Sequence, residues 1–149
     1  MKNLETKHVQ ILHVEDNEGD VLLTQHAFKA AKTPHTISVA QDGELALDYL
    51  YKRNGFEDAV RPDLILLDWN MPKKDGCEVL KTIKEDEALC LIPVIVFTSS
   101  QTDLDVIEAY RLYANSYVLK PADLGQFAAI VNAIDSFWLS MAVPPPFQG

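Results

Sequence analysis

The strongest constraint on this chain is a set of polar residues that each follow a short, strongly apolar run. The runs end at Val14, Leu67, Phe97 and Leu119, and the residues that follow them are Glu15 and Asp16, Asp68, Thr98 and Lys120. Runs this short and this rich in β-branched residues are typical of strands buried in a parallel sheet. In open α/β sheets, ligands bind just beyond the carboxyl ends of the strands. We therefore expect the five polar side chains to meet at one edge of one sheet.

Strand-like and helix-like segments alternate five times along the chain. The predicted strands are 11–14, 36–40, 64–67, 94–97 and 117–119. Residues that can cap a helix open four of the predicted helices: Asp42, Asp75, Thr102 and Asp123. Five units of this kind fold as a parallel sheet that is covered on both faces. The sequence therefore predicts an α/β protein with a flavodoxin-like, doubly wound (βα)5 sandwich.

Several predicted helices carry apolar residues at helical spacing. The first stripe holds Leu23, Ala27, Ala30 and Ala31, the fourth holds Leu104, Ile107 and Tyr110, and the last holds Leu124, Phe127, Ala128 and Val131.

The chain has 149 residues and a mass of 16.7 kDa, which is the size of one domain. We expect a single domain over 1–149, with a core over about 8–140 and an apolar, proline-rich tail over 141–149. The net charge of −9 argues against nucleic acid and anionic membranes as direct partners. No segment reads as a signal peptide or a membrane span, and two thiols without metal-ligand spacing favour reduced cysteines in the cytoplasm.

The three carboxylates Glu15, Asp16 and Asp68 would repel one another if they met at this edge. At about 5 Å and an effective dielectric near 20, each pair repels by roughly 3 kcal/mol. Lys120 offsets one charge, so the cluster needs a divalent cation or raised pKa values. Carboxylate oxygens favour Mg2+ over Zn2+. The alternative is that each acid caps the helix that follows it.

Asp68 is the best candidate for a nucleophile. A carboxylate can attack a phosphoryl group when cationic groups neutralise the transferring oxygens, and Lys120 and the Thr98 hydroxyl could do so. Taken singly, Lys120 could simply pair with an acid, and Thr98 could be an ordinary hydroxyl at the end of a strand.

Four motifs in this order carry a resemblance to a known family. They are Val14-Glu15-Asp16-Asn17, the segment from Asp68 to Gly76, Phe97-Thr98-Ser99-Ser100, and Lys120-Pro121. With them the chain resembles the receiver domain of two-component response regulators over roughly residues 8–140. Together with the long loop from Asn54 to Pro62 and the segment from Pro72 to Gly76, the apolar ending from Ile134 to Pro146 is similar to that of stand-alone regulators that are paired with bacterial phytochromes.

The resemblance implies a role for each matching residue. Asp68 would be the phosphoacceptor, and Glu15, Asp16, Asp68 and the backbone carbonyl of Asn70 would bind Mg2+. Thr98 would be the switch hydroxyl and Lys120 the phosphate-binding lysine, while Tyr117 would rotate when Thr98 moves. The bond before Pro121 is often cis in the family.

The resemblance also implies partners and an output. A sensor histidine kinase or phosphotransfer protein would donate the phosphoryl group. The readout surface would be the helix after Thr98, the last strand and the last helix. Because no output domain follows, a downstream protein target is expected.

Two other functions compete with this interpretation. A small-molecule phosphatase or phosphotransferase could use an aspartyl phosphate, but that class usually carries a second acid where this chain has Asn70. A degenerate receiver would bind partners without phosphate, and the intact set of site residues counts against it. His13 departs from the family, which usually has an aliphatic residue there; a buried, hydrogen-bonded histidine is the favoured role.

The last helix carries a second apolar stripe formed by Ile130, Ile134, Phe137 and Met141. A helix with two apolar faces needs either further cover from its own chain or a partner subunit. Both alternatives stand at this point: a tail that folds back on its own domain, or a homodimer through the last helix and the tail.

Overall fold

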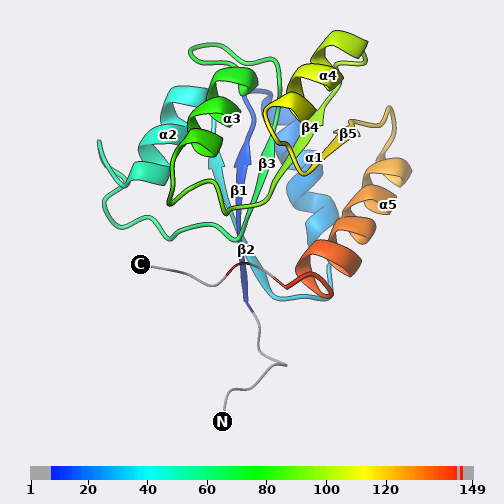
Figure 1. The fold of residues 1–149 in the computed structure, drawn as a ribbon. Coiled ribbons are helices and arrows are strands. Elements are labelled where there is room, and N and C mark those ends of the chain that lie inside the picture. Colours follow the sequence, from blue (N-terminus) through cyan, green and yellow to red (C-terminus); the bar gives the residue numbers. More distant parts are fainter. Residues whose placement is uncertain (1–7, 144, 146–149) are drawn as a thin grey trace.

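A single parallel sheet forms the centre of the computed structural model, which describes residues 8–143 and 145 (Figure 1). Its five strands are β1 (Val9–Val14), β2 (His35–Ala40), β3 (Leu64–Leu67), β4 (Val94–Thr98) and β5 (Ser116–Leu119). They lie in the order β2-β1-β3-β4-β5, and all neighbours are parallel. The predicted flavodoxin-like fold is therefore confirmed, and each predicted strand is found with its ends shifted by two residues at most.

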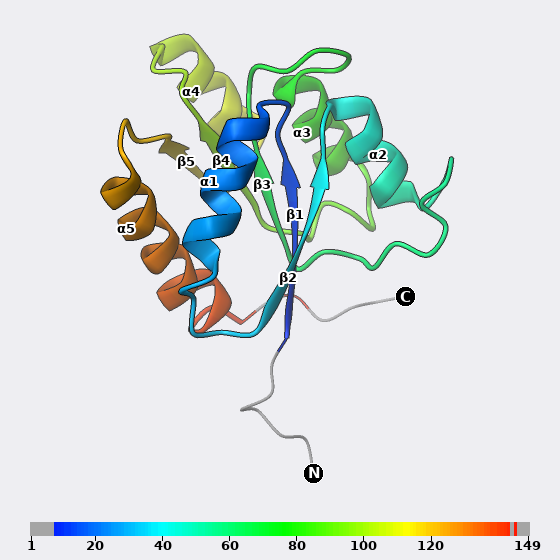
Figure 2. The same cartoon turned by 180° about the vertical axis from the view of Figure 1, so that it is seen from behind.

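Helices cover both faces of the sheet (Figures 1 and 2). They are α1 (Glu18–Phe28), α2 (Gly43–Tyr51), α3 (Gly76–Glu85), α4 (Asp103–Arg111) and α5 (Leu124–Ile134). Helices α1 and α5 pack together on one face, whereas α2, α3 and α4 cover the other. Because both faces are covered, the inner strands β3 and β4 are buried at every residue, as their continuous apolar runs predict.

Two separate cores result from the alternation of side chains along the strands. Leu12, Ile65 and Val96 point to the core under α2 and α3. Ile11, Leu66 and Ile95 point to the core under α1 and α5, where Phe28 and Val131 fill the space between helices and sheet.

Each of the helices α1 to α5 begins at a side-chain cap. The carboxylates of Asp42, Asp75 and Asp123 accept hydrogen bonds from backbone amides in the first turns of α2, α3 and α5. The Thr102 hydroxyl does the same for α4, and the Asn17 side chain for α1. Such caps bind amides that have no partner within the helix, so they fix where each helix starts.

The prediction for the first helix was wrong at its end. Helix α1 ends at Phe28, so Ala30 and Ala31 lie outside it. Beyond Phe28 the hydrogen bonds span three residues instead of four: the amides of Ala30 and Ala31 donate to the carbonyls of Ala27 and Phe28, at 3.3 and 3.0 Å. Within α1 the buried residues are Thr24 and Phe28.

The apolar residues that the sequence places in the fourth helix face solvent in α4. Leu104 is 80% exposed, and Ile107 and Tyr110 are about half exposed. The buried residue of α4 is Ala109, whose small side chain allows the helix to pack closely on the sheet.

Directly after α5, the chain forms a short π-helical turn, η2 (Asp135–Leu139), which packs on its own domain. Leu139 is fully buried in the core under α1 and α5. The buried Asp135 carboxylate accepts the backbone amides of Lys32 and Thr33 at 2.9 and 3.2 Å. These contacts join η2 to the segment between α1 and β2.

The second apolar stripe of the last helix, Ile130, Ile134, Phe137 and Met141, is therefore partly buried and partly exposed. Ile134 is buried, whereas Phe137 and Met141 are 53% and 72% exposed. Residues 144 and 146–149 of the predicted tail lie outside the described residues.

Within the described ranges, no helix is both long and apolar enough to cross a lipid bilayer. Cys77 and Cys90, which the sequence predicts to be reduced, are free thiols.

Candidate functional site

The strand register brings the sequence-predicted residues to one rim of the sheet. Val14 and Leu67 are paired across β1 and β3, so Glu15 and Asp68 follow side by side. The Asp68 amide donates to the Val14 carbonyl at 3.0 Å, which fixes the first residue of the β3–α3 loop. On the other side, the Lys120 amide donates to the Thr98 carbonyl at 2.8 Å. The sheet thus positions four of the predicted residues through their backbones.

The three acids form a cluster with the geometry of a cation site. One carboxylate oxygen from each of Glu15, Asp16 and Asp68 lies within 4.8 Å of the others. Glu15 and Asp68 are buried, whereas Asp16 is exposed. Glu15 Oε1 is buried and forms an ion pair with the Lys120 ammonium. Carboxylate oxygens that converge in this way are the ligands that a hard divalent cation prefers.

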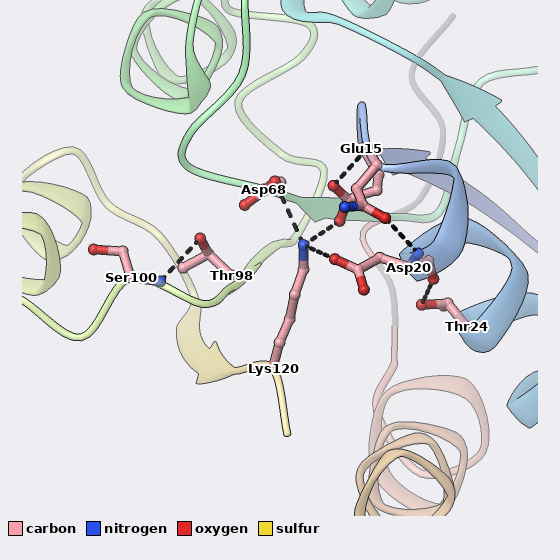
Figure 3. Close-up of polar contacts among 8 residues, drawn as sticks. Glu15, Asp20, Thr24, Asp68, Thr98, Ser100 and Lys120 are labelled. Atoms are coloured by element: carbon pink, nitrogen blue, oxygen red, sulfur yellow. Dashed lines mark hydrogen bonds and ion pairs between the residues drawn. The ribbon is translucent and has the colours of Figure 1, made fainter. Parts of the chain in front are cut away.

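The Lys120 ammonium points toward Glu15 and Asp68, and its side chain is nearly buried (Figure 3). Its Nζ is 2.5 Å from Glu15 Oε1 and 3.5 Å from Asp68 Oδ2. The sequence analysis missed a third partner: Asp20 Oδ2, in the first turn of α1, lies 2.8 Å from the same nitrogen. Asp20 is close to Asp16 and Asn17 in sequence, but only the folded chain, in which α1 packs against α5, brings it to Lys120.

Two effects set the pKa values in the site: burial of the side chains, and the Lys120 ammonium that lies between the carboxylates. Burial raises the pKa of Glu15 to about 7, because Asp68 adds to the effect and Lys120 only partly offsets it. For Lys120, burial lowers the pKa, but the carboxylates of Asp20, Glu15 and Asp68 outweigh it and hold the pKa above its usual value. Lys120 is therefore a permanent cation, and Glu15 is the acid whose charge depends on what binds nearby.

Thr98 and Tyr117 lie beside the acids on the β4–β5 side of the rim. Thr98 is fully buried, and its hydroxyl oxygen accepts the Ser100 amide at 3.4 Å (Figure 3). The Tyr117 hydroxyl donates to the Ser100 carbonyl at 3.0 Å. Ser100 in turn donates its hydroxyl to the Asp105 carboxylate in α4. Thr98 and Tyr117 thus contact the same residue, and that residue is bonded to α4.

The β3–α3 loop, which carries Asp68, packs tightly against the start of α3. A Cβ atom at Gly76 would lie 2.5 Å from the Asp68 carbonyl oxygen and 2.7 Å from Trp69 Cα, so only glycine fits here. Asn70 follows in the loop and is exposed. Among the described residues all peptide bonds are trans, so the cis bond before Pro121 that is often found in the family is not adopted.

His13 lies in β1, two residues before Glu15, and is 1% exposed. The expectation of a hydrogen-bonded histidine is wrong for one ring nitrogen, because Nδ1 is buried without a partner. Burial lowers the pKa of His13 to about 4, and the nearby Lys120 ammonium adds to this shift. His13 is therefore neutral at pH 7.

Comparisons with known proteins agree with this geometry. Residues 11–132 match the model of the response regulator receiver domain. The chain is 42% identical to the response regulator Rcp1 of Synechocystis sp. (strain ATCC 27184 / PCC 6803 / Kazusa), over 91% of this chain and 92% of that protein.

Two solved structures are similar over nearly the whole chain. The crystal structure of the Mn2+-bound form of Rcp1 has a TM-score of 0.88 at 40% identity, covering 93% of this chain and 99% of that one. The phosphorylated cyanobacterial phytochrome response regulator RcpA has a TM-score of 0.90 at 44% identity, covering 94% and 100%.

The chain therefore belongs to the response regulator receiver family and is the receiver domain of a two-component response regulator. It is homologous to phytochrome response regulators. The acid cluster of Glu15, Asp16 and Asp68 fits a divalent cation, in keeping with the Mn2+-bound neighbour.

Proposed function

We propose that Asp68 accepts a phosphoryl group from the phosphohistidine of a sensor histidine kinase or a phosphotransfer protein. The observation that carries this proposal is the position of the Asp68 carboxylate, which lies within 4.8 Å of two other carboxylates and 3.5 Å from the Lys120 ammonium. Glu15, Asp16, Asp68 and the carbonyl of Asn70 would hold Mg2+. When bound, the ion supplies positive charge beside the transferring oxygens.

The transfer itself needs few protein groups. An Asp68 carboxylate oxygen attacks phosphorus, the bond from phosphorus to the imidazole nitrogen breaks, and its electron pair returns to the imidazole of the donor. Lys120 and the Thr98 hydroxyl then bind the oxygens of the aspartyl phosphate. Water later attacks the same phosphorus, the bond from phosphorus to the Asp68 oxygen breaks, and inorganic phosphate leaves the restored carboxylate. The catalysis is thus limited to phosphoryl transfer onto Asp68 and its hydrolysis.

Phosphorylation would switch a protein-binding surface. The phosphoryl group adds a charge of about −1.5 to −2. When Thr98 moves toward it, the Ser100 amide loses its acceptor, and Tyr117 follows through its own bond to Ser100. The readout surface is α4, β5 and α5. The exposed stripe of Leu104, Ile107 and Tyr110 supports this choice, because apolar side chains on a surface favour binding of another protein.

The finer identities of partners and location are also proposals. A bacterial phytochrome is the proposed kinase, on the basis of the similarity to phytochrome response regulators. The last helix and the tail would form a homodimer, which the exposed Phe137 and Met141 support. We place the protein in the cytoplasm, as one domain over 1–149 that contacts neither nucleic acid nor membrane.

Mass spectrometry of the purified chain, incubated with Mg2+ and acetyl phosphate, tests the central proposal. We expect a gain of about 80 Da, the mass of one phosphoryl group. Asp68→Asn should abolish the adduct. Asp58→Asn should retain it, because Asp58 is an exposed acid outside the site. Turnover of small phosphoesters would instead support the phosphatase alternative, and an unmodified chain would support a receiver that acts without phosphate.

Sedimentation with and without beryllofluoride tests the homodimer. A sedimentation coefficient that stays at the monomer value in both conditions would contradict it.

A further inference from the structure

The Lys120 ammonium is shared unequally among its carboxylate partners. Its Nζ lies 2.5 Å from Glu15 Oε1 and 2.8 Å from Asp20 Oδ2, but 3.5 Å from Asp68 Oδ2, the proposed phosphoacceptor (Figure 3). Asp20 is not a member of the acid cluster that could hold a metal ion. Glu15 and Asp68 would share their charge with a bound cation, whereas the Asp20 carboxylate would remain directed at Lys120.

Asp20 is held firmly in this position by its helix. Its amide donates to the Asn17 side chain at 2.9 Å, in the cap of α1. Its carbonyl accepts the hydroxyl of Thr24 at 2.8 Å, and Thr24 is fully buried against the sheet. The backbone of Asp20 therefore cannot follow Lys120 if the lysine moves toward Asp68.

We propose that Asp20 is a positioning residue that restrains Lys120 away from Asp68 and thereby slows phosphorylation. This inference rests on the proposed function of Asp68. An aspartyl phosphate presents new anionic oxygens beyond the Asp68 carboxylate, and Lys120 must turn toward them to stabilise the transfer. Any N–H group that donates to Asp20 is unavailable for those oxygens. The ion pair between Lys120 and Asp20 must weaken during the reaction, and its loss adds to the barrier.

The first test compares phosphorylation rates of charge-matched variants. Asp20→Asn removes the carboxylate that holds Lys120. Glu18→Gln removes the same charge from the same helical turn, at an exposed position that is not a partner of Lys120. With Mg2+ and acetyl phosphate, Asp20→Asn should raise the rate constant of adduct formation by about two- to fivefold, the range that corresponds to a partly exposed ion pair. Glu18→Gln should leave the rate unchanged.

The second test asks whether the effect of Asp20 passes through Lys120. In a Lys120→Gln background, Asp20→Asn should no longer change the rate. The unaltered chain, Asp20→Asn, Lys120→Gln and the double variant are then unfolded with urea in the presence of a chelator. Their urea midpoints measure what the ion pair contributes to stability without metal or phosphate. The midpoint shifts of the two single variants should not add up to that of the double variant.

Several results would overturn the inference. They are a slower rate for Asp20→Asn, an equal gain for Glu18→Gln, an effect that persists without Lys120, and additive midpoint shifts. If the unaltered chain forms no adduct, the proposed function fails and the inference with it. If the unaltered chain is phosphorylated but Asp20→Asn has no effect, only the inference fails.

Discussion

The buried His13 allows a quantitative prediction about acid stability. Burial lowers its pKa to about 4 in the folded chain, against 6.5 for an ordinary histidine, so protons bind the unfolded chain first as the pH falls. The stabilising contribution of the neutral imidazole is fully present above pH 6.5 and is lost as the pH falls toward 4. With these two pKa values, the free energy of unfolding drops by about 2 kcal/mol between about pH 7.5 and pH 5 because of His13 alone.

Replacing His13 with leucine should remove this part of the pH dependence. Leucine fits a buried strand position and does not titrate. In urea unfolding with a chelator present, the loss of stability between the two pH values should be about 2 kcal/mol smaller in His13→Leu than in the unaltered chain. His26→Gln, at an exposed position of α1, controls for the loss of an imidazole.

The comparison of the two proteins separates the effect of His13 from that of Glu15, a second buried group with a shifted pKa. The raised pKa of Glu15, about 7, has the opposite sign: its contribution is present below its ordinary pKa and is lost as the pH rises through 7. Glu15 is the same in both proteins, so its contribution cancels in the comparison. Equal losses of stability in His13→Leu and the unaltered chain would refute the reasoning, because they would mean that the histidine is protonated equally in both states.

Three further predictions concern stability. Lys120→Ala leaves the buried Glu15 without its cation, so it should lower the free energy of unfolding by about 3 kcal/mol at pH 8. The loss should be smaller at pH 6, because Glu15 is protonated there. Equal losses at the two pH values in urea unfolding would contradict this. Gly76→Ala forces a Cβ against the Asp68 carbonyl and should cost about 1–3 kcal/mol in thermal unfolding, whereas Gly125→Ala, with its nearest neighbour at 3.4 Å, should cost nothing. Asp135→Ala leaves two backbone amides without their acceptor and should cost about 1–3 kcal/mol, with partial recovery in Asp135→Asn; an unchanged urea midpoint would argue against the role of this carboxylate.

Local patterns in the sequence were sufficient to predict the fold and most of the residues that meet at one rim of the sheet. The strands were recognisable because a buried parallel strand needs a continuous apolar run, and four helix starts because a cap needs an oxygen at one position. Asp68 and Lys120 could be assigned to one rim because the ends of parallel strands meet there. None of these inferences requires knowledge of which side chains touch across the fold.

Contacts between distant residues were decided by tertiary packing. Asp20 meets Lys120 across 100 positions of sequence, and Asp135 binds the amide of Lys32 across 103. The exposure of Leu104 and its neighbours, and the burial of Leu139, likewise depend on how closely α4 and η2 pack on the sheet. Periodicity tells which residues share a face of a helix, but only the assembled layers determine whether that face meets the core, another side chain or solvent.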